Sequence, residues 1–245
     1  MRRKSPRHSR LLMGVLLICV IVGIVFALVH TGLVGDAFGV WGIGVNNSSG
    51  PSDSSLGSVD DSAKALDQLP VLQTHSESVP RYSRDEFGQR WADVDRNGCD
   101  TRNDILRRDL RSLQVKTSSP NCVVVGGILD DPYTGRTIDF RKGKNSSDQV
   151  QIDHVVALAD AWRSGAWQWD APRRQEFAND PTNLLAVDGN ANQDKGASRA
   201  DQWLPPNTRY RCAYVQRQIV VKSSWGLGVT PQEKKAMKMV LDHCE

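Results

Sequence analysis

The sequence predicts an α+β domain in which a small antiparallel β-hairpin is flanked by helices. Three observations support this prediction. Residues 121–140, NCVVVGGILDDPYTGRTIDF, read as two short strands around a turn at DPYTG. Residues 149–155, QVQIDHV, and 183–187, NLLAV, are short apolar runs typical of strands. The last part of the chain follows a helical pattern, with Thr230 as the cap of the final helix and Pro231 in its first turn.

Helical patterns also lie outside the predicted strands. Phe87 and Trp91 are four residues apart, and an apolar stripe that includes Leu106 follows a capping Asp100. The segment between the last two predicted strands is too long for a tight hairpin and is rich in tryptophan. We expect it to be a helical excursion whose tryptophans pack onto the hairpin rather than stack on nucleobases.

The N-terminal segment is distinct from this domain. Residues 1–10 carry five Arg and Lys and no acid, and residues 11–29 are uncharged and apolar. In a helix, a run of that length spans about 30 Å, the thickness of a bilayer core. The basic residues predict that 1–10 form a cytoplasmic tail and that everything after 29 lies outside the cytoplasm. Residues 11–29 are therefore a transmembrane anchor or a signal peptide, and their length favours the anchor.

Residues 30–79 are expected to form a flexible linker. The stretch 46–70 is rich in Ser, Gly and Asp and nearly lacks bulky apolar residues. Such a segment cannot bury enough surface to offset the entropy lost on ordering. The folded domain is accordingly placed at residues 80–245, a length sufficient for one hydrophobic core.

The cysteine pattern agrees with export. Four cysteines follow the apolar run, at positions 99, 122, 212 and 244, and none forms a C-x-x-C pair, which disfavours a zinc ribbon. In an oxidising compartment they predict two disulfides, for which three pairings exist. Cys99–Cys122 and Cys212–Cys244 are the favoured pairs, because they would staple the two ends of the domain.

The charge of the exported part excludes one class of function. Without the basic tail, 26 basic residues face 28 acidic residues. The domain is therefore not a generally basic nucleic-acid-binding protein, and any contact with a polyanion must be local.

One group of residues carries candidate chemistry. Asp153 and His154 are adjacent at the end of an apolar run, and adjacent residues of a regular strand face opposite sides. One side chain can thus hold a metal while the other meets a substrate, although a hydrogen-bonded structural histidine explains His154 alone equally well. Asn183, Asn192 and Lys195 follow in NDPTNLLAVDGNANQDKG.

At these residues the sequence resembles the HNH endonucleases. In that family an Asp-His pair ends the first strand of a hairpin, an Asn starts the second, and the following helix contributes a His or Asn. The motifs DVDRNGCDTRNDIL, DPYTG, DHVVALADAW, ANDPTNLLAV, NQDKG and WLPP are closer still to the DUF1524-type branch of secreted actinobacterial HNH proteins. The resemblance covers residues 80–245 and implies a ββα-metal core, a hairpin plus a helix around one divalent ion.

The resemblance also implies roles for individual residues. Asp153 and Asn192 would hold one divalent metal, and the amide oxygen of Asn192 favours Mg²⁺, with Mn²⁺ as the alternative. His154 would be the general base. Asn183 would position the histidine-bearing segment, and Lys195 would contact phosphate. A further candidate for the substrate phosphate is Arg102, for which a structural salt bridge is an equally good explanation.

The expected function is an exported, metal-dependent endonuclease that cuts DNA, with RNA as a second substrate. Since no helix-turn-helix or zinc finger is present to read bases, we expect low sequence specificity. Residues 11–29 would bind the membrane if they are not cleaved, and no protein partner is inferred. The alternatives are a catalytically inactive cell-surface binding module on the same scaffold and a metal-dependent hydrolase of another substrate.

Overall fold

The computed structural model describes residues 56–72, 79–117, 122–143 and 147–244. The chain divides into two units at residue 48, and the first unit lies outside the described residues, as do the predicted basic tail and the apolar run 11–29. Among the described residues, no helix has both the length and the apolarity needed to cross a bilayer.

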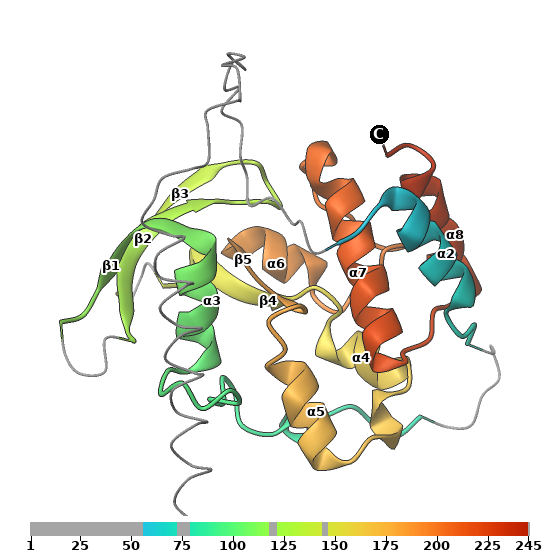
Figure 1. Ribbon diagram of the computed structural model, residues 1–245, viewed down its shortest axis with the longest axis horizontal. Coiled ribbons are helices and arrows are strands. Elements are labelled where there is room, and N and C mark those ends of the chain that lie inside the picture. The colour runs from blue at the N-terminus through green and yellow to red at the C-terminus, as the bar shows by residue number, and fades with distance from the viewer. Residues whose placement is uncertain (1–55, 73–78, 118–121, 144–146, 245) are drawn as a thin grey trace, which may run out of the picture. The chain divides into compact units, whose positions relative to one another are not determined.

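The second unit contains two antiparallel sheets, which confirms the predicted α+β class (Figure 1). Strands β1 (Leu110–Val115), β2 (Val124–Asp130) and β3 (Thr137–Arg141) form one sheet in the order β1-β2-β3. Strands β4 (Val150–His154) and β5 (Leu184–Asp188) form the other. The sequence did not predict β1, which pairs irregularly with β2.

The predicted turn DPYTG joins β2 to β3 and also ties the two sheets together. The buried carboxylate of Asp131 accepts hydrogen bonds from the backbone amides of Tyr133 and Thr134 inside the turn. It also accepts one from the amide of Asp188, at the end of β5, at 2.9 Å. The turn therefore holds Tyr133 close to the hairpin β4–β5.

Helices lie beside the two sheets, and the sheet of β1, β2 and β3 is at the left of the view (Figure 1). Helix α3 contacts both sheets, and α6 contacts both β4 and β5, so that β4, β5 and α6 form a hairpin plus a helix. The helices and 3-10 turns after residue 80 are η1 (Arg84–Phe87), α3 (Thr101–Asp109), α4 (Leu158–Arg163), η2 (Ala166–Gln168), α5 (Ala171–Ala178), α6 (Gly189–Lys195), η3 (Thr208–Tyr210), α7 (Arg211–Trp225) and α8 (Pro231–Leu241).

Helix α6 begins unusually close to the chain that enters β4. A Cβ atom built on Gly189 would lie 1.9 Å from the carbonyl oxygen of Asp148, so only glycine fits there. Asp188 caps the helix by accepting from the amide of Ala191, and Gly196 ends it with a positive φ of 51°. The helix is thereby fixed against the hairpin at its first residue.

The prediction of a flexible linker is wrong for residues 59–68. Residues Val59–Gln68 form helix α2, which Ser58 caps and which packs against α7 and α8. Leu66 is buried, and so is Leu69 directly after the helix, in the same cluster as the core residues of α7. These few leucines, spaced along one face, bury enough surface to order the segment despite its polar composition.

The expected helix through Phe87 and Trp91 is also shorter than predicted. Only η1 forms, because Gly88 adopts a φ of 70° and Trp91 a φ of 55°, both of which turn the chain away from a helix. The insertion between β4 and β5 is helical, as predicted. Trp162 is buried, and Trp169 packs edge-on against Phe177 at 5.4 Å.

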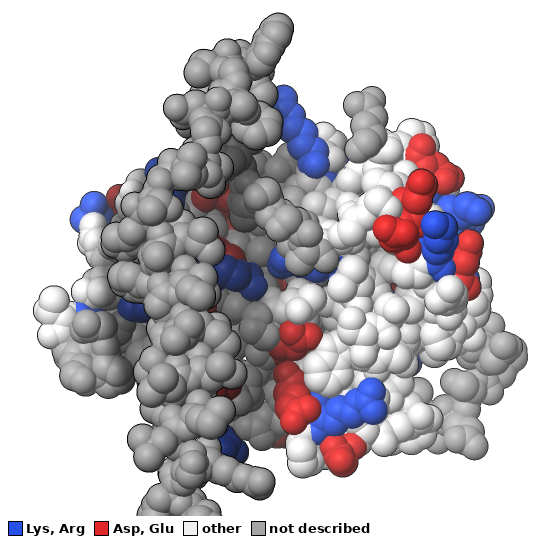
Figure 2. Space-filling model, in the orientation of Figure 1, with Lys and Arg blue, Asp and Glu red and all other residues white. Residues whose placement is uncertain are grey.

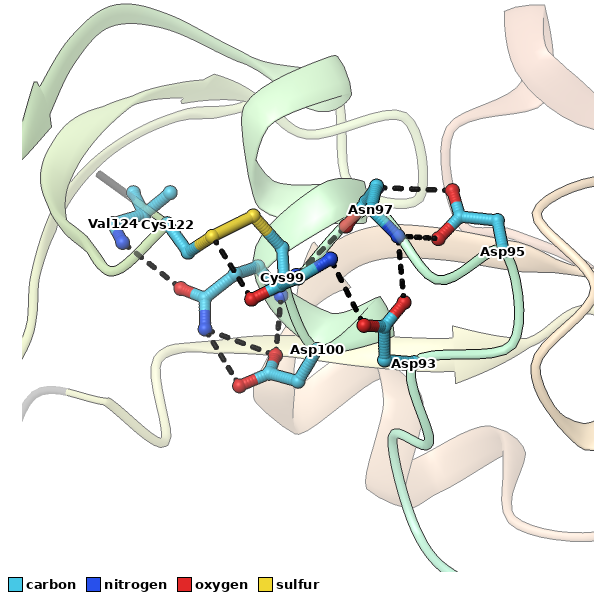
Figure 3. Close-up of a disulfide and its surroundings, with 9 residues drawn as sticks. Asp93, Asp95, Asn97, Cys99, Asp100, Cys122 and Val124 are labelled. Atoms are coloured by element: carbon cyan, nitrogen blue, oxygen red, sulfur yellow. Dashed lines mark hydrogen bonds between the residues drawn. A yellow bond between two sulfur atoms is a disulfide. The ribbon is translucent and has the colours of Figure 1, made fainter. Parts of the chain in front are cut away.

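The structure contains both disulfides that the sequence favours, Cys99–Cys122 and Cys212–Cys244. The first links the loop before α3 to the start of the β2 segment (Figure 3). The second links the first turn of α7 to Cys244, three residues after the end of α8. Each bridge closes one end of the domain.

Candidate active site

Three of the predicted site residues come together. Asp153, His154 and Asn192 line one open cleft of about 300 Å³, together with Tyr82 and Arg84. Asp153 and His154 lie at the end of β4, and Asn192 lies on α6, so the hairpin-plus-helix arrangement is what brings them together. A larger hollow of about 430 Å³, near Trp203, is lined by none of these five residues.

His154 is held in one orientation. Its Nε2 lies 2.8 Å from the carbonyl oxygen of Ala178, and its ring stacks against Trp91 with an interplanar angle of 12°. Because a carbonyl oxygen can only accept, Nε2 carries the proton and Nδ1 is left as the acceptor. Burial lowers the pKa of His154 to about 3, and the charge of Arg84 adds to this effect. The ring is therefore neutral near pH 7.

Asp153 is a buried carboxylate with two partners. Its Oδ1 accepts from the ammonium of Lys195 at 2.9 Å, and its Oδ2 accepts from the hydroxyl of Tyr133 at 2.5 Å. Burial raises the pKa of Asp153, whereas the positive charge of Lys195 opposes that rise. Each oxygen keeps one further lone pair after these contacts.

Lys195 is not where the sequence analysis expected it. Its side chain is 0% exposed, and its ammonium also donates to the backbone carbonyl of His154 at 2.9 Å. Because Lys195 is the last residue of α6, its side chain extends under the end of β4 rather than into the cleft. It balances the charge of Asp153, fixes the backbone of His154 and does not line the cleft, so its predicted contact with phosphate stays a prediction.

Asn183 lies directly before β5 and is fully buried. Its Oδ1 accepts from the amide of Val156 at 2.8 Å, and its Nδ2 donates to the carbonyl oxygen of the same residue at 3.2 Å. Its own carbonyl oxygen accepts from the amide of Val155. Asn183 thus holds the two residues after His154, which is the geometry expected of it, and its contribution to catalysis stays a prediction.

Asn192 is half-buried on α6, where its Nδ2 donates to Oε1 of Gln151 at 2.9 Å. No donor within the described ranges bonds to its Oδ1. Asp153 and Asn192 together fit a hard divalent ion in donor type and in place, since Mg²⁺ takes few protein ligands and keeps several waters. Within the described ranges, no cluster of three or more His, Cys, Asp and Glu side chains could hold a metal by itself.

Arg102 has a different role from the two that were considered. Its Nη2 donates to the carbonyl oxygen of Val150, the first residue of β4, at 3.1 Å. Arg102 is not among the residues that line the cleft. It therefore anchors α3 to the start of β4 and does not meet a substrate phosphate at this site.

Arg84 is the cleft residue that sequence reasoning missed. It is the first residue of η1 and lines the cleft beside His154. Nothing in the spacing of YSRDEF connects it to a histidine so far along the chain. The sequence offered one local signal that this stretch is ordered: Phe87, three residues later, is apolar and is buried in the core.

The loop before α3 follows a known pattern that the sequence analysis did not interpret. The pattern is that of a calcium-binding loop and consists of Asp93, Asp95, Asn97, Gly98 and Asp104. Its last position holds Asp104, where such loops usually have Glu. In the structure the loop closes on itself (Figure 3). The carboxylate of Asp93 accepts from the amides of Asn97 and Gly98, and that of Asp95 accepts from the side chain of Asn97.

The surface charge is mixed, as the composition predicts. On the face seen in Figure 2, the described Lys and Arg side chains alternate with Asp and Glu, and they form no continuous basic area.

Comparison with known proteins gives two matches. Residues 100–240 match the family described as "GmrSD restriction endonucleases, C-terminal domain". An "Uncharacterized secreted protein" of Arthroderma benhamiae is 41% identical over 165 residues, which cover 66% of this chain and 76% of that protein. No solved structure matches the chain.

Proposed function

This chain belongs to the family of the C-terminal domain of GmrSD restriction endonucleases, and from that premise we propose an exported, metal-dependent endonuclease. It hydrolyses phosphodiester bonds of DNA, with RNA as a second substrate, and has little sequence specificity. One observation carries the proposal: a carboxylate, a neutral imidazole and an amide, from Asp153, His154 and Asn192, line the same open cleft.

The tautomer of His154 leaves an acceptor nitrogen for a general base. Because Nε2 is committed to the carbonyl of Ala178, the free acceptor Nδ1 can take a proton from an attacking water. Stacking on Trp91 and the bonds that Asn183 makes to Val156 keep the ring and the following backbone in place. A divalent ion held by Asp153 and Asn192 would supply charge stabilisation at the phosphate and the leaving oxygen.

The arrangement of β4, β5 and α6 supports the finer proposal of an HNH-type site. A hairpin whose first strand ends in Asp-His, whose second strand follows an Asn, and whose next helix carries an Asn and a Lys is what the HNH resemblance implies. The DUF1524-type branch and the identity of the metal, Mg²⁺ or Mn²⁺, belong to the same proposal.

Two observations support a location outside the cytoplasm. The described domain holds two disulfides, which persist in oxidising compartments. The relative from Arthroderma benhamiae is described as secreted. Retention at a membrane by residues 11–29 is part of the proposal.

The test is cleavage of plasmid DNA by the purified full chain with Mg²⁺, with and without EDTA. We expect nicking that EDTA abolishes and that His154→Ala lowers by roughly 10²- to 10⁴-fold, the usual contribution of a general base. Circular dichroism should show that the variant is still folded at the assay temperature, although its Tm falls because the ring's contacts with Trp91 and Ala178 are lost.

The matched control is the other histidine of the domain. His243 is exposed near the C-terminus and bonds only to the carbonyl of Met239 within the described ranges. His243→Ala should cut at the parental rate. Equal cleavage by His154→Ala and the parent would remove His154 as the base, and a folded parent that never cuts would refute the nuclease.

A second candidate, a catalytically inactive binding module on the same scaffold, is favoured by one observation. The charge of Asp153 is already balanced by Lys195, so the site is electrostatically complete without a metal. That candidate predicts binding of a ligand at the cleft with no cleavage under any metal, which the same plasmid assay decides.

A further inference from the structure

We propose that Arg84 binds the scissile phosphate at the cleft, where its guanidinium holds the non-bridging oxygens beside the imidazole of His154. This inference rests on the proposed function and deepens it, because it names a substrate-binding residue and the chemical group that the residue recognises. The two sequence-based candidates for that contact, Lys195 and Arg102, are both committed to protein groups.

One nitrogen of the Arg84 guanidinium lacks a hydrogen-bond partner. Its Nη1 is buried from water, yet within the described ranges it has no hydrogen-bond acceptor. The charges of Tyr82 and Asp85 favour the guanidinium, but no carboxylate of those ranges lies within ion-pair distance of it, whereas Arg174, for example, pairs with Glu86 at 3.1 Å. A desolvated donor left unsatisfied destabilises a fold, and at the wall of a cleft a bound anion would satisfy it.

The position of Arg84 is fixed by its neighbours in η1. Phe87 is 0% exposed and packs against Trp162 and Phe177, with ring centroids about 6 Å apart. Arg174 of α5 donates to both the backbone and the side chain of Glu86. The turn is therefore held from both sides, and the cation at its start is presented to the cleft without further ordering.

Arg84 and His154 are close enough to act on one ligand. Both line the same open cleft, which has a volume of about 300 Å³. Apart from Arg84, no Lys or Arg is among the described residues that line this cleft. An anion placed between the two side chains would satisfy the guanidinium and lie next to the acceptor nitrogen of the imidazole.

The chemistry of the site selects a phosphodiester. The planar fork of an arginine matches two phosphate oxygens, which a lysine cannot do. The neighbouring imidazole can serve a water that attacks the same phosphorus. A nucleic-acid backbone offers both the paired oxygens and a bond to be cleaved, so it is the ligand that uses every group at the cleft.

The test compares Arg84→Met and Arg84→Lys with the parent, all as full chains, in two assays. The first is plasmid cleavage with Mg²⁺. The second is binding of a fluorescein-labelled single-stranded DNA oligonucleotide in EDTA, followed by anisotropy at several salt concentrations. Arg81→Met is the matched control, because Arg81 is an exposed arginine three residues earlier that does not line the cleft.

We expect Arg84→Met to lower cleavage roughly 10- to 100-fold, the loss of one charge-assisted contact. The slope of log Kd against log salt should fall by about 0.7, one phosphate contact to a single strand. Arg84→Lys should keep the slope but recover only part of the cleavage, because it keeps the charge and loses the fork. Arg81→Met should match the parent in both assays.

Stability separates this role from a structural one. Since the guanidinium leaves a donor unsatisfied, Arg84→Met should unfold at the parental Tm or above it. A lowered Tm, or parental binding and cleavage by Arg84→Met, would overturn the proposal. If the parent binds DNA through Arg84 but cuts none, the phosphate site stands and the nuclease falls.

Discussion

Two lysines of this protein are fully buried beside carboxylates, and they serve different purposes. Lys195 joins α6 to the end of β4, where it contacts Asp153, which lines the open cleft. Lys222 of α7 contacts Asp160 of α4 and Glu233 of α8, at 3.0 and 2.8 Å. The chemistry is the same in both places, and the surroundings differ.

The surroundings of Lys222 are closed. Asp160 is 2% exposed and Glu233 is 0% exposed, and neither lines the cleft. Burial alone would lower the pKa of Lys222, but the two carboxylates raise it above its usual value. This cluster connects three helices and does not line the cleft. Asp153 differs because it lines the open cleft, although it is only 5% exposed.

The largest expected effect is on the closed cluster. Lys222→Met leaves Glu233 buried without a cation and leaves Asp160 with only Arg163, at 3.7 Å, which should lower the free energy of unfolding by about 3–5 kcal/mol. Urea denaturation measures the loss, and the fraction that stays folded should cut DNA at the parental rate. Adding Asp160→Asn and Glu233→Gln should restore much of the stability. A parental midpoint for Lys222→Met alone would show that the cluster is not structural.

A smaller loss of stability is expected at the cleft. After Lys195→Met, Asp153 keeps the hydroxyl of Tyr133 and access to cleft water, so unfolding should become easier by only about 1–3 kcal/mol. Cleavage should fall at least about tenfold, because the backbone of His154 loses a contact. Adding Asp153→Asn should recover stability and not cleavage. If Lys195→Met cleaves DNA at the parental rate, Lys195 is purely structural, as Lys222 is.

The smallest effect is a dependence on alkaline pH. Because the folded pKa of Lys222 lies above the ordinary 10.5, its stabilisation is complete below pH 10.5 and is lost as pH rises through the folded value. Burial also raises the pKa values of Tyr133 and Tyr214, so the parent and Lys222→Met both weaken above pH 10.

Only the difference in stability between the parent and Lys222→Met reports the ionisation of Lys222. Urea midpoints measured from pH 8 to 12 should keep a constant gap up to about pH 10.5 and then converge. A gap that closes below pH 9 would contradict the raised pKa of Lys222.

Much of the fold could be predicted because its signals are local. The turn DPYTG, the apolar runs around β4 and β5, and the cap of α8 lie within a few residues of the structure that they specify. The adjacency of Asp153 and His154 also survives folding, because consecutive residues at the end of a strand cannot separate. These features need no knowledge of distant contacts.

The predictions that failed depend on contacts between residues that are far apart in the sequence. Helix α2 is ordered by α7 and α8, which follow far later in the chain, so composition alone gives no sign of it. Arg84 and His154 meet because η1 packs on the insertion between β4 and β5, through Phe87. Lys195 was expected to contact phosphate because most lysines are exposed. Only the path of α6 under β4 shows that its side chain is buried and that its ammonium bonds to Asp153 and to the carbonyl of His154.

The disulfide Cys212–Cys244 has a consequence for resistance to proteases. It ties Cys244, three residues after the end of α8, to the first turn of α7, so that α8 is held by a covalent bond as well as by its packing. Reduction of this bond should therefore make α8 the easier of the two helices to open locally, and an added protease should cut there sooner in the reduced protein than in the oxidised one.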